Sequence, residues 1–344
     1  MTESATRPGV DAPEVILPAY GCPDLVSACI RAEVIPRLVD LAPDCWCYDY
    51  AALARQVTAN TVAIVAVNLL GVGDDADRLR AFCNTREIAL IQDSAQDLPR
   101  TAVSWPGDYV VFSFGRGKPL NLLQGGALVS PVAAAQPRPT APTRFTFKSR
   151  LLTTRAVGLA FDLLTHPWIY GHLSAVPRTG LGDVVYEPLD RAARFPDSFW
   201  RIAGPAFDQY RVQPSYRLAI WAPAFDRWRS LGIQELKSPT APSNPEPLRL
   251  ALLAPDRGSR DALVESFNRA GIGSSRLYGT ELSRVAGIPD VVKTQGPFPQ
   301  AARLADRLLT LPTHSLVTAR TVRTLLEVLD KWHPALRSPL PRAR

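Results

Sequence analysis

The sequence lacks an apolar run long enough to cross a membrane, since its longest candidate, AVGLAFDLL, is short and contains Asp162. The N-terminal stretch MTESATRPGVDAPE also lacks the basic and apolar regions of a secretory signal. With 344 residues, 46% of them hydrophobic and 21% charged, the chain has the composition of a soluble globular protein. We therefore predict a cytoplasmic protein without membrane binding that forms two lobes around a large core.

Cysteine and histidine are scarce as well. The five cysteines include no Cys-x-x-Cys pair, and Cys45 and Cys47 form a lone Cys-x-Cys without the second pair of ligands that a zinc site needs. The four histidines show no ligand spacing. The sequence therefore predicts no metal site and reduced, structural thiols.

Lysine is rare in this basic chain. The net charge of +7 comes mostly from arginines spread along the sequence, without a dense basic run interleaved with aromatic residues, so we expect no nucleic-acid partner. Of only five lysines, Lys118 stands in the glycine-flanked loop of VVFSFGRGKPLNLLQGGALV. This position suggests that the side-chain amine of Lys118 has a chemical role in addition to its positive charge.

The first third of the chain alternates between strand-like and helix-like segments. Apolar runs predict strands at 14–20, 34–41, 62–70, 88–93, 109–114 and 126–129. Helical patterns occupy 23–33, 49–57 and 74–86, and the last opens on Asp74 and Asp75, which suit a helix start. Apolar strands between helices indicate an α/β fold with a mostly parallel sheet.

Proline-rich stretches at 130–143 and 237–247 divide the chain. The segment between them has a helical and aromatic pattern. Beyond them, strands are expected at 248–254 and 309–312, and helices at 259–271, 298–309 and 317–332. We predict a large α/β domain at 1–130, a linker and helical interface region at 131–236, a small α/β domain at 237–335 and a loose tail at 336–344.

Two stretches resemble phosphate-binding motifs but depart from them at essential positions. Gly117-Lys118 resembles the end of a P-loop, but Pro119 replaces the Ser or Thr that holds magnesium. The stretch beginning at Gly71 resembles a dinucleotide fingerprint, but Asp74 and Asp75 stand where the pyrophosphate would bind. Helix capping explains these aspartates more simply.

Polar residues follow the ends of two predicted strands. Asp93 and Gln96 follow the strand at 88–93, and Ser113 and Lys118 lie at and just past the end of the strand at 109–114. Ligands bind at the carboxyl ends of strands in such sheets. Together these residues provide the acid, the amide, the hydroxyl and the amine that pyridoxal 5'-phosphate (PLP) needs. For any one of them, a capped turn or a solvated loop residue remains an alternative.

Four motifs strengthen the PLP interpretation. VILPAYGCP, QDSAQD, SFGRGK and QGGALV are similar, in order and spacing, to those of the DegT/StrS family of fold-type-I, PLP-dependent aminotransferases, many of which act on nucleotide-linked keto-sugars. The resemblance is specific between about residues 14 and 130 and weaker in the C-terminal part. It implies a homodimer, an amino donor such as glutamate and a keto-sugar acceptor.

The resemblance also implies individual roles. Asp93 matches the partner of the pyridine nitrogen, and Gln96 matches an amide near the phenolic oxygen of the cofactor. Ser113 matches a phosphate ligand. Lys118 matches the catalytic Schiff-base lysine.

Several positions differ from the family pattern. Cys22 stands where many relatives place an aromatic residue that stacks on the cofactor ring. Gln209 replaces the Asn that reaches the phosphate in a neighbouring subunit, Gln124 replaces a Glu, and Asn68 replaces a common His. We therefore expect Cys22 and Gln209 to contact PLP, through contacts that differ from those in the family pattern.

The family usually carries several dozen further residues before the strand at 14–20, including a Gly-Thr or Gly-Ser helix start that cups the phosphate. We therefore expect a mis-assigned start codon, a fragment or an incomplete cofactor cup. The leading hypothesis is an aminotransferase. The alternatives are a truncated or degenerate member that serves as a non-catalytic binding or scaffold protein, and a PLP enzyme with another outcome such as dehydration, which the retained Lys118 disfavours.

Overall fold

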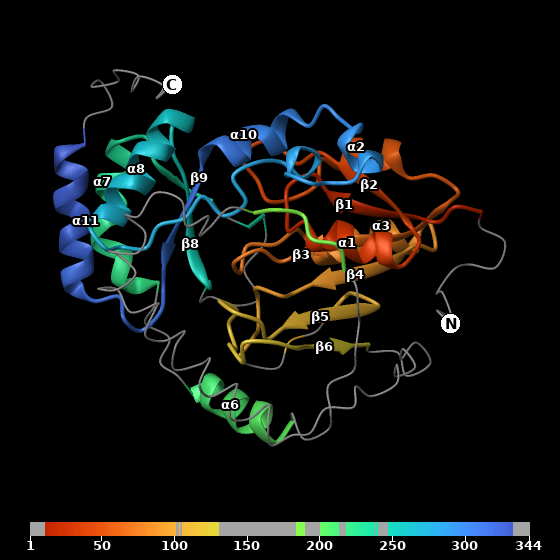
Figure 1. The fold of residues 1–344 in the computed structure, drawn as a ribbon, viewed down its shortest axis with the longest axis horizontal. Coiled ribbons are helices and arrows are strands. Elements are labelled where there is room, and N and C mark those ends of the chain that lie inside the picture. Colours follow the sequence, from red (N-terminus) through yellow and green to blue (C-terminus); the bar gives the residue numbers. More distant parts are fainter. Residues whose placement is uncertain are drawn as a thin grey trace.

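The N-terminal lobe is built on a six-stranded sheet (Figure 1). The computed structural model describes residues 11–100, 103, 105–130, 184–189, 200–212, 218–236, 238–239 and 247–332. The strands are β1 (Glu14–Pro18), β2 (Ile35–Val39), β3 (Thr61–Val67), β4 (Ala89–Asp93), β5 (Tyr109–Ser113) and β6 (Gly126–Val129). Their order is β2-β1-β3-β4-β5-β6, and every pair is parallel except β5 with β6. The predicted mostly parallel α/β sheet is confirmed.

Helices cover both faces of this sheet, because alternate side chains of each strand point to opposite sides. The helices are α1 (Asp24–Arg31), α2 (Tyr50–Gln56) and α3 (Ala76–Asn84). On one face Ile16, Ile64 and Leu90 pack in the core to which α2 and α3 contribute. On the opposite face Leu17 and Val65 share a core with residues of α1. On the second face, a cavity lies between the sheet and α1, with Leu17, Val65 and Ile91 in its wall.

The turn before α3 offers no phosphate site, because the carboxylates of both its aspartates already accept hydrogen bonds from protein groups. The carboxylate of Asp75 accepts a hydrogen bond from the backbone nitrogen of Arg78 at 2.9 Å and caps the helix. Asp74 accepts hydrogen bonds from the backbone of Tyr48 at 2.7 Å and the hydroxyl of Tyr50 at 2.9 Å. The capping interpretation is confirmed for Asp75 and is wrong for Asp74, whose carboxylate instead binds the segment that contains Tyr48 and Tyr50.

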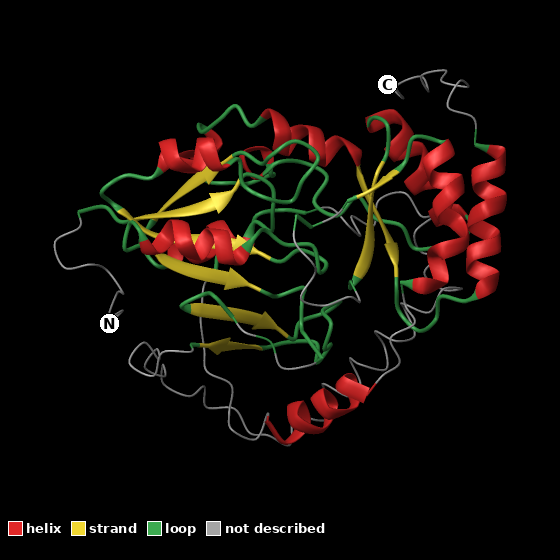
Figure 2. Cartoon of the chain, turned by 180° about the vertical axis from the view of Figure 1, so that it is seen from behind, coloured by secondary structure: helices red, strands yellow, loops and turns green. Residues whose placement is uncertain are grey.

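The C-terminal lobe has a smaller antiparallel sheet (Figures 1 and 2). Its strands are β7 (Gln234–Glu235), β8 (Arg249–Leu253) and β9 (Leu308–Pro312), in that order. Around them lie η3 (Ala219–Ala224), α7 (Phe225–Ser230), α8 (Arg257–Arg269) and α11 (Ala319–Lys331). Because Trp221 and Trp228 lie in this core, we propose that the lobe begins near residue 218 instead of residue 237.

One helix of the interface region is described. This helix, α6 (Trp200–Val212), packs against the sheet near β5, where the hydroxyl of Tyr210 donates to the carbonyl oxygen of Leu98 at 2.6 Å. Most of the remaining helical pattern predicted for 145–230, the proline-rich stretch after Ser130 and the tail at 336–344 lie outside the described residues.

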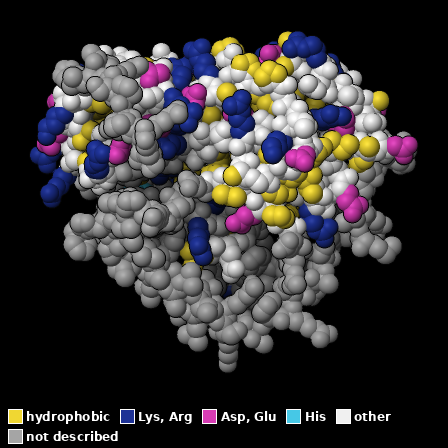
Figure 3. Space-filling model, turned by 45° about the horizontal axis from the view of Figure 1, so that its top comes forward, with side chains coloured by type: hydrophobic (Ala, Val, Ile, Leu, Met, Phe, Trp, Pro, Cys, Tyr) yellow, Lys and Arg dark blue, Asp and Glu magenta, His cyan; other side chains and the backbone are white. Residues whose placement is uncertain are grey.

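The surface carries mixed charge. On the face shown in Figure 3, Lys and Arg side chains are scattered among Asp and Glu side chains instead of gathering in one block. Within the described ranges, no helix combines the length and the apolar character needed to cross a membrane.

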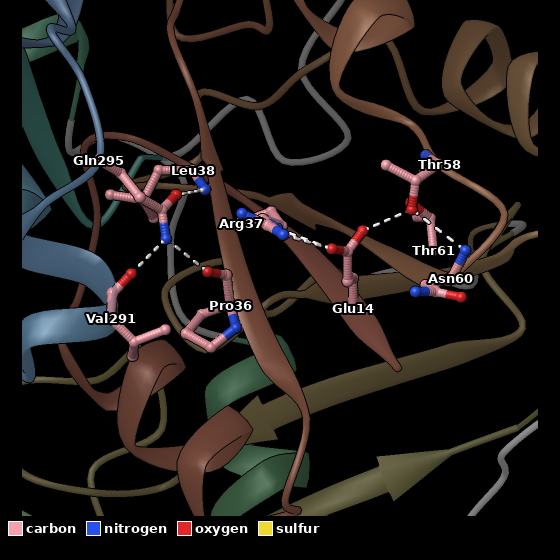
Figure 4. A network of polar contacts seen from close by, with 9 residues as sticks. All are labelled: Glu14, Pro36, Arg37, Leu38, Thr58, Asn60, Thr61, Val291 and Gln295. Atoms are coloured by element: carbon pink, nitrogen blue, oxygen red, sulfur yellow. Dashed lines mark hydrogen bonds and ion pairs between the residues drawn. The ribbon is translucent and has the colours of Figure 1, made fainter. Parts of the chain in front are cut away.

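Short segments between α8 and β9 join the two lobes. They include η4 (Leu282–Arg284), α9 (Asp290–Lys293) and α10 (Pro299–Arg307). After α9, the side chain of Gln295 accepts from the backbone nitrogen of Leu38 and donates to the carbonyl oxygen of Pro36, both at 2.8 Å (Figure 4). The backbone nitrogen of Leu282 donates to the carbonyl oxygen of Ala19 at 2.8 Å. These bonds hold η4 next to the carboxyl end of β1 and hold the turn after α9 alongside β2.

The prediction of reduced cysteines is wrong for one pair. Cys45 and Cys47 form a disulfide, with Cα atoms 5.4 Å apart. The turn after β2 is closed by the backbone nitrogen of Ala42, which donates to the carbonyl oxygen of Cys47 at 2.9 Å. This turn brings the two Cα atoms within the range that a disulfide requires, which composition alone cannot reveal. Cys22, Cys29 and Cys83 are free thiols, as predicted.

Candidate active site

Polar side chains gather at the carboxyl edge of the large sheet. Asp93 ends β4 and Ser113 ends β5, and because these strands are parallel their ends meet at one edge. Both residues line a cavity of about 470 Å³ between the sheet and α1. Its other polar lining residues are Cys22, Asp24, Asn68, Gln96, Lys118 and Tyr278.

Two glycines shape the loop that carries Lys118. Gly117 has a φ of +69°, a left-handed conformation that favours glycine, and it turns the chain just before the lysine. Gly126 pairs with Ser113 across the β5–β6 ladder, and a Cβ atom there would lie 2.3 Å from the carbonyl oxygen of Phe112. The glycines of this stretch thus permit the tight return that brings Lys118 to the cavity wall.

The charge of the cavity depends on Asp93 and Lys118. Burial raises the pKa of Asp93, while the backbone N–H of Ala95, which donates to its carboxylate at 2.9 Å, and the nearby positive charge of Lys118 act in the opposite direction. Lys118 is the only lysine or arginine among the described residues that line the cavity. A buried carboxylate thus faces a space that contains one primary amine.

Gln96 links the cavity to the C-terminal lobe. Its amide nitrogen Nε2 lies 3.1 Å from the hydroxyl oxygen of Tyr278 and donates to it. Its amide oxygen Oε1 is buried and has no hydrogen-bond partner among the residues that the structure describes. A buried polar atom without a partner is costly, so the Gln96 amide needs a further hydrogen-bonding group or a different orientation to be satisfied.

Tyr278 was not among the predicted site residues. It lies 182 positions from Gln96 in the sequence, so no local pattern connects the two. The only signal was that its segment, SRLYGTEL, resembles the C-terminal part of the family.

Cys22 lines the cavity as a neutral thiol. Burial, together with the nearby carboxylate of Asp24, raises its pKa to about 11. Of the nearby aromatic residues, Tyr20 and Trp46 are buried, and Tyr20 packs edge-on against Trp46 and Tyr278, with ring centroids 5.0 Å and 5.6 Å away. The described cavity wall therefore offers a thiol at the position where the family pattern has an aromatic ring.

Gln209 does not join the other predicted residues. It is exposed on α6 and is not part of the cavity wall, whereas Cys22, Asp93, Gln96, Ser113 and Lys118 all line it. Its expected contact with a neighbouring subunit concerns a second copy of the chain and stays a prediction. In the described part of the chain, no three His, Cys, Asp or Glu side chains are grouped as a metal site would require.

The arrangement fits PLP. The cofactor needs an amine for its aldehyde, an acid beside its pyridine nitrogen and polar groups around its other oxygens. Lys118, Asp93, Gln96 and Ser113 supply these groups in one cavity, and the buried Oε1 of Gln96 leaves an amide unsatisfied by the described protein atoms.

Comparisons with known proteins agree with this arrangement. Residues 5–136 and 229–330, more than half of the chain, match the DegT/DnrJ/EryC1/StrS aminotransferase family. An L-glutamine:2-deoxy-scyllo-inosose aminotransferase of Micromonospora echinospora is 34% identical over 129 residues, which are 36% of this chain and 31% of that protein. The chain thus matches less than a third of the length of this curated relative.

Solved structures extend the similarity to the whole fold. A DegT DnrJ EryC1 StrS aminotransferase from Brucella abortus is 17% identical with a TM-score of 0.65, and the match covers 95% of this chain and 81% of that one. DesV of S. venezuelae, solved with a ketimine intermediate, is 20% identical with a TM-score of 0.65, covering 94% and 79%. At these identities the structural likeness concerns the fold.

Proposed function

Because this chain belongs to the DegT/DnrJ/EryC1/StrS aminotransferase family, we propose that it binds PLP in the cavity beneath α1 and transfers an amino group to a keto-sugar or keto-cyclitol. One observation carries the proposal: a lone lysine amine and a buried carboxylate share a single cavity with Gln96 and Ser113. A non-catalytic scaffold protein, the alternative hypothesis, would not need all four of these side chains in one cavity.

Each residue then has a physical task. When bound, PLP supplies the electron sink that stabilises negative charge at the substrate Cα. The carboxylate of Asp93 favours a protonated pyridine nitrogen, and the hydroxyl of Ser113 donates to the phosphate. The amide of Gln96 would contact the phenolic oxygen. The amine of Lys118 would hold the cofactor covalently through its aldehyde carbon and would move the proton at the substrate Cα.

The substrate class follows from the curated relative. That protein is named for L-glutamine as donor and 2-deoxy-scyllo-inosose as acceptor. We therefore propose L-glutamine ahead of glutamate as the donor, and a cyclic polyol ketone as the acceptor. A nucleotide linkage on the acceptor, the homodimer and the cytoplasmic location stay predictions.

Visible absorption of the purified chain with added PLP tests the proposal. We expect a band of lysine-bound cofactor in the wild type, its loss in Lys118→Ala, and its retention in Lys293→Ala. Lys293 is an exposed lysine on α9 and serves as the matched control. Addition of L-glutamine should then convert the band to that of the amine form.

The outcomes separate the hypotheses. A lysine-dependent band that no amino acid converts would favour a PLP-binding protein without turnover. The absence of any band in the wild type would refute the proposal.

A further inference from the structure

We infer that Tyr278 of the C-terminal lobe is a positioning residue that orients the amide of Gln96 toward the bound cofactor. The inference rests on the proposed function. Its starting point is the hydrogen bond of 3.1 Å between Gln96 Nε2 and the Tyr278 hydroxyl at the wall of the cavity that also contains Asp93 and Lys118.

The segment that carries Tyr278 is fixed at both ends. On one side, Ser275 exchanges backbone hydrogen bonds with Thr310 of β9, at 2.8 Å and 3.2 Å. On the other side, Leu282 donates to the carbonyl oxygen of Ala19 at the end of β1. The small lobe thus holds Tyr278 in a set position above the large sheet.

The backbone conformation directly before Tyr278 also indicates that the position of this side chain is constrained. Leu277 has a φ of 58°, in the left-handed region that a non-glycine residue adopts at a cost of about 1 kcal/mol. The side chain that follows is half-buried, and its ring packs edge-on against Tyr20 at 5.6 Å. An unfavourable backbone conformation directly before a packed polar side chain indicates a constraint on where that side chain lies.

The tyrosine hydroxyl stays protonated, since burial raises the pKa of Tyr278 well above its usual value. A neutral hydroxyl both donates and accepts. A half-turn of the Gln96 amide, which exchanges two atoms of nearly equal size, lets the Tyr278 O–H donate to Oε1, so that this buried oxygen gains its missing partner. Nε2 keeps its two N–H donors in this orientation and would be the group available to the phenolic oxygen of PLP.

The pH dependence of the lysine-bound PLP band tests this. Donation to the phenolic oxygen withdraws charge from beside the linked lysine nitrogen, so its loss should make that nitrogen hold its proton to higher pH. In Tyr278→Phe we expect the midpoint of the band to rise by about 0.5 to 1 pH unit, the equivalent of one hydrogen bond. Tyr48→Phe removes another buried hydroxyl, which donates to the Val65 carbonyl at 2.7 Å in the core with α2 and α3, and should leave the midpoint unchanged.

A double-mutant cycle with Gln96→Leu decides whether Tyr278 acts through Gln96. In the Gln96→Leu background, Tyr278→Phe should shift the midpoint no further. The same cycle on urea unfolding of the cofactor-free chain should show coupling of about threefold or more in the unfolding equilibrium constant. Equal shifts in both backgrounds, or a midpoint indifferent to Tyr278→Phe, would overturn the inference while leaving the proposed function standing. A wild type without the band refutes the proposed function and the inference together.

Discussion

The carboxylate of Asp40, directly after β2, accepts a hydrogen bond from the backbone nitrogen of Ala301 at 2.8 Å. It also accepts one from Gln300 at 3.0 Å, so a residue of the large lobe caps the first turn of α10. The residue that precedes this helix, Phe298, provides no side-chain cap. Asp40 of the large lobe therefore acts as the N-cap of α10, although it is distant from this helix in the sequence.

We predict that Asp40→Ala lowers the free energy of unfolding by about 1 to 2 kcal/mol, because it leaves two backbone donors without a partner. Asp49→Ala is the control, since Asp49 caps α2 within its own lobe through Ala51 and Ala52. Urea unfolding of both variants gives the comparison. If the lobes behave as one cooperative unit, both variants lower the midpoint of a single transition. A second transition in Asp40→Ala alone would show that the lobes unfold separately.

Asp93 should make the cofactor-free chain pH-sensitive. Its folded pKa is raised by burial, so the folded state binds more protons than the unfolded state as pH rises above about 4. The free energy of unfolding of the wild type should therefore fall, relative to Asp93→Asn, as pH rises from about 3.5 to 8, a range that begins below the unfolded pKa of about 4. Asp74, whose pKa burial also raises, is present in both proteins and cancels. Parallel urea titrations at both pH values measure the difference, and an unchanged difference would contradict the burial of a charged Asp93.

The same substitution should abolish most of the proposed activity. An amide beside the pyridine nitrogen cannot stabilise its positive charge, so we expect at least about a hundredfold loss in the rate of the L-glutamine half-reaction. Stopped-flow absorbance of the PLP band measures this rate. A variant within tenfold of the wild type would place the acid elsewhere.

Gln295 should contribute to lobe attachment through hydrogen bonds that only an amide can make. Its oxygen accepts from Leu38 and its nitrogen donates to the carbonyl oxygens of Pro36 and Val291 (Figure 4). Gln295→Glu keeps the shape but replaces a donor by an acceptor, so we expect a loss of about 1 to 3 kcal/mol in the free energy of unfolding. Gln234→Glu, at an exposed position of β7, should change it by less than about 0.5 kcal/mol. Equal effects of the two substitutions would contradict this role.

The large sheet could be predicted from the sequence, because its strands are short apolar runs that alternate with helices. Such apolar runs are buried when the chain folds. The sequence was also sufficient to bring Asp93, Gln96, Ser113 and Lys118 into one hypothesis, because the ends of parallel strands must share an edge. These are local patterns combined with one topological rule.

What the sequence could not provide depends on contacts between distant segments. The Tyr278–Gln96 bond, the Asp40 cap of α10 and the inclusion of η3 and α7 in the small lobe all join segments with no common periodicity. The Cys45–Cys47 disulfide was missed for another reason, since it depends on the closure of one turn and composition argued against it.

The cysteines give a direct count that tests this correction. Denatured without reductant, the chain should show three titratable thiols, and five after reduction. In the native protein, iodoacetamide should modify Cys22 slowly at pH 7.5 even though it lines the cavity, because burial raises its pKa to about 11 and little thiolate is present. Five thiols before reduction would contradict the disulfide, and rapid modification of Cys22 would contradict its buried, neutral state.

Cys22 also allows a gain-of-binding test. A thiol gives a cofactor ring little to stack on, whereas an aromatic side chain contributes about 0.5 to 1.5 kcal/mol through ring contact. The cavity, at about 470 Å³, has room for a larger side chain at its wall. We therefore expect Cys22→Phe to tighten PLP binding about three- to tenfold, measured by titration of the visible band. Cys22→Ser, which is small and polar, should bind PLP as the wild type does. Weaker binding by Cys22→Phe, with an unchanged unfolding midpoint, would mean that the ring of PLP does not lie against residue 22.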